Sequence, residues 1–291
     1  MKKVMITTAT VIALVASAGT SMAGPTSVLG QFNFAPDVFS SVSQVRNYVD
    51  VDADRSVSTY SDDQRYDQDF LSGEVAGGQL FGGLEIGTST LTSNVTSRLA
   101  NANVSANAFD TTLSALWVAD SQFYIDGQFR YGEFDSSIGL NGRDTLDVDG
   151  SGYQISVELG KSFTLQNDWT LTPQVQVTYS DIDLDNGADQ AALARVGSLA
   201  DDDALTGRLG LRAERSFADN SLLYGQIDLY QGFGNDPSVA YGEDSAAMSI
   251  GGVVALSDHS QLYGEITDET GLGSNSGDHN VSWNIGYELR F

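Results

Sequence analysis

The chain has 291 residues, no cysteine and a formal net charge of −25. This charge argues against nucleic-acid binding, because neutralising phosphates requires basic stripes. Without cysteine, neither disulfide bonds nor thiolate chemistry is available.

Residues 1–23 have the three parts of a secretory signal peptide. Lys2 and Lys3 precede an apolar run over residues 4–18, and Ser21-Met22-Ala23 places small residues where a signal peptidase reads them. The apolar run is shorter than the ~20 residues that a membrane-spanning helix requires. We therefore predict cleavage after Ala23 and an exported mature chain.

Residues 24–44 form a short lead with little strand character. Pro36 suits the first turn of a short helix that would carry Phe39, Val42 and Val45 on one side. Two readings stay open for this lead, a helix inside a barrel lumen and a disordered periplasmic segment. The predicted barrel domain then covers residues 45–291.

A period of two begins near Val45. Asp50, Asp52 and Asp54 alternate with apolar residues, which predicts a strand with a carboxylate stripe on one face. A helix-loop-helix calcium site is disfavoured, because Arg55 stands where that motif needs glycine. No metal site is predicted here.

The alternation continues through eleven further segments. These predicted strands lie near residues 67–75, 80–90, 109–117, 123–131, 153–159, 169–179, 205–214, 223–229, 248–256, 262–266 and 280–291. In the last of them, every second residue from Val281 onward is apolar, and the aromatic residues lie near both ends of that face. A transmembrane barrel strand of ~10 residues with aromatic girdles has this pattern.

The connections alternate between short and long. The short ones, near 76–78, 119–122, 165–168, 218–221 and 257–260, are typical of tight hairpin turns. The long polar ones lie near 56–66, 91–106, 136–150, 184–204, 231–244 and 268–279. This alternation predicts an all-β fold, a twelve-stranded antiparallel transmembrane β-barrel with short turns in the periplasm and long loops outside.

The alternation also assigns charged residues to the interior of the barrel. A charge on the lipid face near the midplane would cost ~2–4 kcal/mol for arginine, so we expect the charges to point inward. The expected lumen-facing charges are Arg130, Glu158, Arg208, Arg212, Glu214 and Glu288. Acidic residues of the lumen and loops would favour cations in any conducting pathway.

Catalytic chemistry has little support in the sequence. The two histidines, His259 and His279, fall in a predicted periplasmic turn and at the base of an outer loop, so neither a catalytic triad nor a histidine metal cluster is readable. The run Asp201–Asp203 is typical of a solvated loop. We predict no enzyme, no catalytic residue, no cofactor and no metal.

Several runs resemble the translocator β-domain of type V autotransporters. They are FYIDGQFRYGEFDSS (123–137), GYQISVELGKSF (152–163), WTLTPQVQVTYSDIDLD (169–185), LTGRLGLRAERSF (205–217) and residues 261–291. The resemblance implies a twelve-stranded barrel, a helix in its pore and export of an attached passenger. Only a short segment separates Ala23 from the first predicted strand, so we expect no passenger here.

The final strand also resembles the signal by which the barrel-assembly machinery of the outer membrane recognises its clients. The residues that carry this resemblance are Trp283, Tyr287, Leu289 and Phe291. The expected partners are this machinery, outer-membrane lipid and lipopolysaccharide, and we expect a monomer without nucleic acid. The expected function is a structural barrel or narrow pore in a Gram-negative outer membrane; the alternatives are a small porin and a loop-mediated adhesin.

Overall fold

The computed structural model describes nine stretches of the chain, and their regular elements are all β-strands. The described residues are 40–50, 56–96, 101–140, 143–185, 202–217, 221–233, 244–257, 260–273 and 279–290. The strands are β1 (Ser40–Asp50), β2 (Ser56–Glu74), β3 (Gly78–Thr96), β4 (Asn101–Ala119), β5 (Phe123–Leu140), β6 (Arg143–Lys161), β7 (Phe163–Thr164), β8 (Trp169–Asp185), β9 (Asp202–Ser216), β10 (Leu222–Gly232), β11 (Ser245–Ser257), β12 (Ser260–Gly271) and β13 (His279–Arg290). The all-β antiparallel class predicted from the sequence is confirmed.

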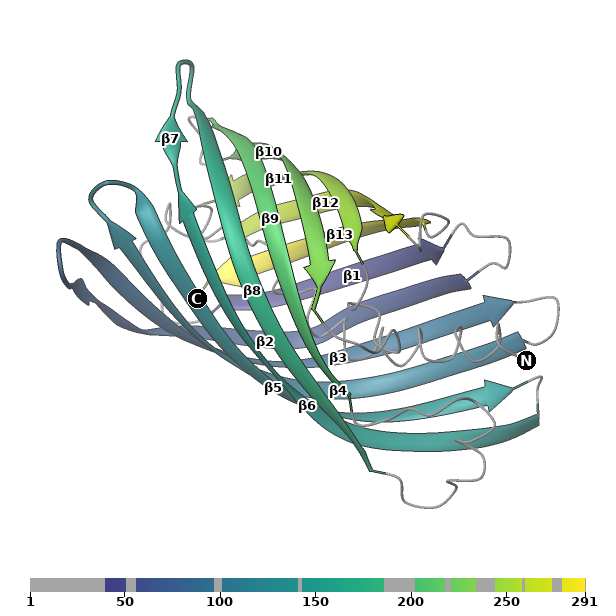
Figure 1. Ribbon diagram of the computed structural model, residues 1–291. Helices are drawn as coiled ribbons and strands as arrows, with labels where there is room; N and C mark the ends of the chain where they lie inside the picture. The colour runs from purple at the N-terminus through teal and green to yellow at the C-terminus, as the bar shows by residue number, and fades with distance from the viewer. Residues whose placement is uncertain are drawn as a thin grey trace.

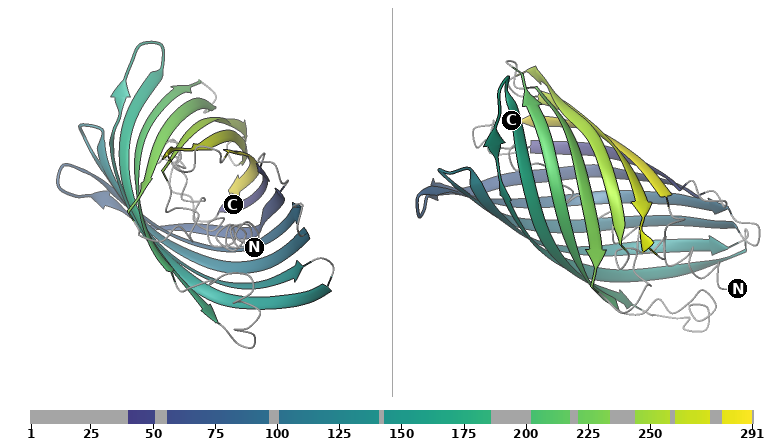
Figure 2. Two further views of the ribbon diagram at one scale, coloured as in Figure 1. Left: turned by 45° about the vertical axis from the view of Figure 1, so that its right-hand side comes forward. Right: turned by 45° about the horizontal axis from the view of Figure 1, so that its top comes forward.

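One antiparallel sheet contains all thirteen strands. Consecutive strands are neighbours, apart from β7, and β6 also pairs directly with β8. The first and last strands pair as well, from Ser40 opposite Arg290 to Asp50 opposite Asn280. Figures 1 and 2 show how strongly the sheet curves, which places β1 beside β13 although they are far apart in the sequence.

Strand β7 is an extension of β6. It has two residues, follows β6 after the single residue Ser162, and pairs with Leu171 and Thr170 of β8. At the interruption, the hydroxyl oxygens of Ser162 and Thr172 lie 3.0 Å apart and are buried. The β6–β8 hairpin therefore continues past a local irregularity and projects from the sheet in Figure 1.

The two faces of the sheet differ in polarity. In β6, the side chains of Gln154, Ser156 and Glu158 are buried. The apolar side chains between and beside them are exposed, including those of Ile155 and Val157. Successive side chains of a strand point to opposite faces, so the polar face is the enclosed one. This arrangement is the reverse of a water-soluble protein, in which the charged residues are the exposed ones.

Several strands are longer than the sequence predicts. The predicted long connections near 56–66, 91–106 and 136–150 were wrong in extent, because most of their described residues belong to β2, β3, β4, β5 and β6. Strand β1 likewise begins at Ser40, ahead of the predicted start at Val45. Backbone hydrogen bonds hold these polar segments in the sheet without an apolar alternation, which was the signal used to recognise strands.

The described tight turns lie where the sequence places them. Val75 and Gly78 exchange backbone hydrogen bonds of 2.9 and 3.1 Å, and the two residues between them have positive φ. The indole N–H of Trp117 donates a 2.8 Å hydrogen bond to the Val75 carbonyl, which fixes this turn to β4. Positive φ at Gln122 marks the next turn of this end, between β4 and β5.

Two tyrosine rings lie flat against glycines of the neighbouring strand. Tyr124 is opposite Gly160, and a Cβ added to Gly160 would come within 2.4 Å of the ring. Tyr224 is opposite Gly251, where an added Cβ would come within 2.5 Å of the ring. These glycines leave the space in which each ring covers the backbone of the next strand.

Some sequence predictions lie outside the described residues. They include the signal peptide 1–23, most of the lead 24–44, and the positions Asp52, Asp54 and His259. Among the described residues, no helix is long and apolar enough to cross a membrane.

Candidate functional site

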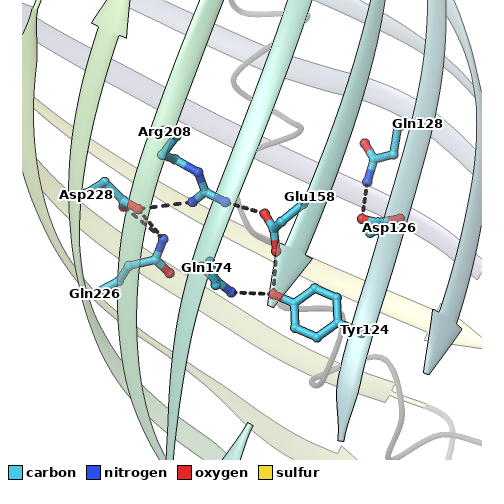
Figure 3. Close-up of polar contacts among 8 residues, drawn as sticks. All are labelled: Tyr124, Asp126, Gln128, Glu158, Gln174, Arg208, Gln226 and Asp228. Atoms are coloured by element: carbon cyan, nitrogen blue, oxygen red, sulfur yellow. Dashed lines mark hydrogen bonds and ion pairs between the residues drawn. The ribbon is translucent and has the colours of Figure 1, made fainter. Parts of the chain in front are cut away.

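The candidate site is the buried face of strands β4 to β10, where charged and amide side chains collect. Its centre is the guanidinium of Arg208 on β9, which is 4% exposed. Arg208 Nη2 contacts Glu158 Oε2 on β6, and Nη1 contacts Asp228 Oδ1 on β10 at 3.1 Å. One cation therefore joins carboxylates on both sides of its own strand, as Figure 3 shows.

Tyr124 and Gln174 extend this network on the side of Glu158. The Tyr124 hydroxyl donates a 2.5 Å hydrogen bond to Glu158 Oε1, and Gln174 Nε2 donates a 3.0 Å hydrogen bond to the same hydroxyl. Tyr124 is only 1% exposed. The ring held over Gly160 thus has a polar end with two fixed partners, so its position is set by packing and by hydrogen bonds together.

Gln226 completes the network on the side of Asp228. Its Nε2 donates to Asp228 Oδ1 at 3.0 Å and to Oδ2 at 2.8 Å. The network that we call the Arg208 network consists of Tyr124, Glu158, Gln174, Arg208, Gln226 and Asp228. It links five strands, because its members come from β5, β6, β8, β9 and β10.

A second cation, Arg212, lies four residues further along β9, on the same face. Its Nε contacts Glu214 Oε2 at 3.0 Å, and its Cζ lies 3.6 Å from the centre of the Tyr224 ring. The Tyr224 hydroxyl in turn donates a 2.6 Å hydrogen bond to Glu265 on β12. The charge of Arg212 is therefore stabilised by a carboxylate and by an aromatic face.

A third cation occupies the neighbouring part of the face. Arg130 Nη2 on β5 lies 3.0 Å from Asp110 Oδ1 on β4, and both side chains are buried. On β5, Gln128 donates a 3.1 Å hydrogen bond to Asp126. Removing one partner of the Arg130–Asp110 pair would leave an uncompensated buried charge, so this pair stabilises the contact between β4 and β5.

The structure places five of the six expected lumen charges on this buried face. Arg130, Glu158, Arg208, Arg212 and Glu214 are each less than 9% exposed. The backbone of Glu288 lies in β13, opposite Val42 and Gln261, and its side chain is outside the described set.

The predicted assembly-signal residues are described in part. Trp283 is exposed. Tyr287 and Leu289 belong to β13 by their backbone pairing, and Phe291 is outside the described residues.

Of the six residues of the Arg208 network, sequence reasoning named only Glu158 and Arg208 as site residues, and it did not name the partner of Arg130. All the missed residues alternate with exposed apolar side chains of their strands, so the alternation contained a signal for their face; they are Tyr124, Gln174, Gln226, Asp228 and Asp110. It contained no signal for their partners, since Arg208 contacts Glu158 across fifty positions of the chain. Only the strand register determines which of these side chains meet.

The described residues include no group of three or more histidine, aspartate and glutamate side chains that could hold a metal ion. The carboxylates of the buried face are instead occupied by arginine, tyrosine and amide donors. The chemistry that the face offers is therefore electrostatic, in the form of fixed charges along a polar wall.

A curved antiparallel sheet with charges on its enclosed face and large apolar side chains on its exposed face defines the class of outer-membrane β-barrels. Within this class, the autotransporter β-domain model matches residues 61–267. The chain belongs to the autotransporter β-domain family.

Curated relatives match part of their own length. The chain is 31% identical over 245 residues to the adhesin BmaC autotransporter of Brucella suis biovar 1, a match that covers 77% of this chain and 7% of the relative. It is 35% identical over 111 residues to the BrkA autotransporter of Bordetella pertussis, covering 36% of this chain and 10% of the relative. The match thus concerns a small part of each long relative.

Solved structures show the same fold. The translocator domain of autotransporter NalP from Neisseria meningitidis has a TM-score of 0.69 at 16% identity, covering 95% of this chain and 98% of that chain. The β-domain of the Bordetella autotransporter BrkA has a TM-score of 0.65 at 20% identity, covering 88% of this chain and all of that chain. Together with the family match, these likenesses indicate the outer membrane of Gram-negative bacteria as the location.

Proposed function

We propose that this chain forms a closed twelve-stranded barrel across the outer membrane and acts as a structural barrel or narrow pore without catalytic activity. Two pairings support closure, that of β1 with β13 and that of β6 with β8. With β7 counted as the end of β6, each of the twelve strands then has two neighbours. A closed sheet leaves no unpaired edge in the hydrocarbon of the membrane.

The observation that carries this proposal is the reversed polarity of the two faces. Arg208 and Arg212 are 4% and 1% exposed, whereas Leu209 between them is 60% exposed. An arginine turned toward lipid at the midplane would cost ~2–4 kcal/mol, and a leucine there is favoured. The exposed face is therefore the lipid-contacting face of the proposed barrel, and the buried face is its lumen wall.

The charges of the lumen wall favour cations. Five buried carboxylates, those of Asp110, Asp126, Glu158, Glu214 and Asp228, face three buried guanidinium groups on this wall. The whole chain, these residues included, has a formal net charge of −25. A cation entering such a pathway is attracted and an anion is repelled, so any conductance of the proposed narrow pore is cation-selective.

Recording in planar bilayers tests this pore. We expect a small, cation-selective conductance, and we expect Asp126→Asn to reduce the preference for cations because it removes a carboxylate from the lumen wall. Asp149→Asn is the matched control, since Asp149 is an exposed residue and its loss should leave the reversal potential unchanged. A large, stable, anion-selective conductance of the parent protein would contradict the proposal.

Cysteine labelling tests the proposed orientation, in which the long connections face the outside. The parent chain has no cysteine, so Ser198→Cys in a long connection and Ser121→Cys in the β4–β5 turn give single, nearly isosteric labels. We expect a membrane-impermeant maleimide to label Ser198→Cys on intact cells and to label Ser121→Cys only after lysis. The opposite labelling pattern would reverse the topology.

A further inference from the structure

Two cations lie on the exposed face at the end of the sheet that carries the tight turns. Lys161 ends β6, with its Nζ 5.4 Å from the centre of the Phe163 ring. Arg215 lies near the end of β9, with its Cζ 5.4 Å from the centre of the Phe217 ring. Trp169 of β8, between these two strands, is directly opposite Arg215. We call these five residues the basic rim.

The strand alternation turns the basic rim outward. Lys161 points to the same side of its strand as Val157 and Leu159. Arg215 points to the same side as Leu209 and Leu211. These four apolar side chains are exposed. The rings of Phe163, Trp169 and Phe217 are exposed as well. Cations and aromatic rings thus share the boundary at which the apolar face ends.

The cations of the basic rim differ from the other described cations in their partners. Arg130, Arg208 and Arg212 are buried and paired with carboxylates. Within the described part of the chain, Lys161 and Arg215 form no ion pair, and Arg215 Nε is buried without a hydrogen-bond partner. Since no described carboxylate pairs with them, we treat these two charges as available to an anion from outside the chain.

The opposite end of the exposed face carries charges of the other sign. Glu133 and Asp135 on β5 and Asp149 on β6 are exposed there, on the same side of the sheet as the basic rim. These exposed acids of β5 and β6 thus lie toward the long connections, whereas the two cations of the basic rim lie toward the tight turns. This polarity distinguishes the two lipid leaflets electrostatically.

We propose that the basic rim binds the phosphate of anionic phospholipid headgroups in the inner leaflet of the outer membrane. This inference rests on the proposed membrane-spanning barrel. Aromatic rings occupy the headgroup level of a membrane, and basic residues there attract anionic lipids. The guanidinium of Arg215 offers several donors to a phosphate, whereas Lys161 acts as a point charge. Lys161 and Arg215 contact headgroups on either side of the β7–β8 hairpin.

Quenching of a single tryptophan by brominated lipid tests this proposal on the full chain. The chain has three tryptophans, so replacing Trp117 and Trp283 with phenylalanine leaves Trp169 of the basic rim as the only tryptophan, which is excited selectively over tyrosine at long wavelength. The protein is refolded into phosphatidylcholine vesicles with brominated phosphatidylglycerol or brominated phosphatidylcholine. We expect about a fivefold preference for phosphatidylglycerol, falling to equal quenching in Lys161→Gln/Arg215→Gln and weakening with salt.

Two control variants separate charge from structure. Lys161→Arg/Arg215→Lys should keep the preference, since both charges remain, and Glu133→Gln/Asp149→Asn should keep it because these acids lie at the other end of the face. Equal quenching by both lipids in the parent protein, or an unchanged preference in Lys161→Gln/Arg215→Gln, would overturn the proposal. Stronger displacement of brominated phosphatidylglycerol by lipid A would overturn the assignment to the inner leaflet.

Gel mobility before and after heating, measured on the same samples, separates this inference from the function on which it depends. A heat-modifiable parent protein that shows no lipid preference defeats the lipid inference alone. If the parent protein never shows the mobility of a folded barrel, the proposed barrel itself is contradicted.

Discussion

Replacing Arg208 with methionine is expected to lower the free energy of unfolding by ~3–5 kcal/mol, because it leaves buried carboxylates without their counter-charge. Arg208 is the only cation in the Arg208 network, and it contacts both Glu158 and Asp228. Equilibrium unfolding in urea, performed on protein refolded in detergent micelles, measures the change. The temperature at which the folded band disappears on a gel gives an independent reading.

The rescue variant distinguishes an uncompensated charge from a lost side-chain volume. Arg208→Met combined with Glu158→Gln and Asp228→Asn removes the cation and both carboxylates together, so much of the lost stability should return. Such strong non-additivity is typical of residues in one network. If the single variant unfolds at the same urea concentration as the parent protein, the Arg208 network does not hold the wall together.

Replacing Gly160 with alanine is expected to destabilise the barrel by ~1–3 kcal/mol through overpacking. The new Cβ would meet the Tyr124 ring at 2.4 Å, and the ring has little freedom to move, because its hydroxyl is bonded to Glu158 at 2.5 Å and to Gln174 at 3.0 Å. The same unfolding measurement applies. The folding yield should fall as well, since the ring must leave the site that connects β5 to β6.

Gly127→Ala is the matched control for this substitution. Gly127 is in β5, the strand of Tyr124, and the nearest atom to its added Cβ is the Ala115 carbonyl oxygen at 3.9 Å, an ordinary contact distance. Gly127→Ala should therefore leave the free energy of unfolding nearly unchanged. Adding Tyr124→Ser to Gly160→Ala should relieve the clash, so that the pair costs less than the sum of the two single changes. Equal effects at Gly160 and Gly127 would contradict the proposed packing role of the Tyr124 ring.

The local alternation of the sequence indicates the fold class, and it indicates the face of a charged side chain such as Glu158. In β6, the alternation of Val157 with Glu158 assigns Glu158 to the polar face, and the structure buries that side chain. The rule works because consecutive side chains of any strand point to opposite sides, whatever the neighbouring strands are. Nothing beyond local spacing is needed for it.

The partners and the strand lengths were not predictable in this way. Arg208 meets Glu158 and Asp228 because β9 lies between β8 and β10 in one particular register, and register is a property of the whole sheet. The ends of β3 and β4 are polar segments rich in serine, threonine and asparagine, which have the composition of loops. Their pairing with each other, from Thr96 opposite Asn101 inward, makes them strands.

The long hairpins give the proposed barrel walls of unequal height. Strands β2, β3, β4 and β6 have 19 residues each, whereas β10 has 11 and β12 and β13 have 12. A bilayer takes up only ~9–11 residues of a tilted strand. In β4, the large exposed apolar side chains that are described begin at Phe109, so in the proposed barrel the preceding residues from Asn101 would extend beyond the lipid.

The opening of such a barrel would be oblique. Its wall would be taller on the side of β2 to β6 and lower on the side of β10 to β13. A large particle that approaches the cell surface, such as an antibody or a bacteriophage, would contact the taller wall first. This contact would keep it away from the opening. A small solute would reach the opening by the shortest path over the lower wall, on the side of β10 to β13. Shortening the β3–β4 hairpin would level the mouth without altering the lumen wall below it.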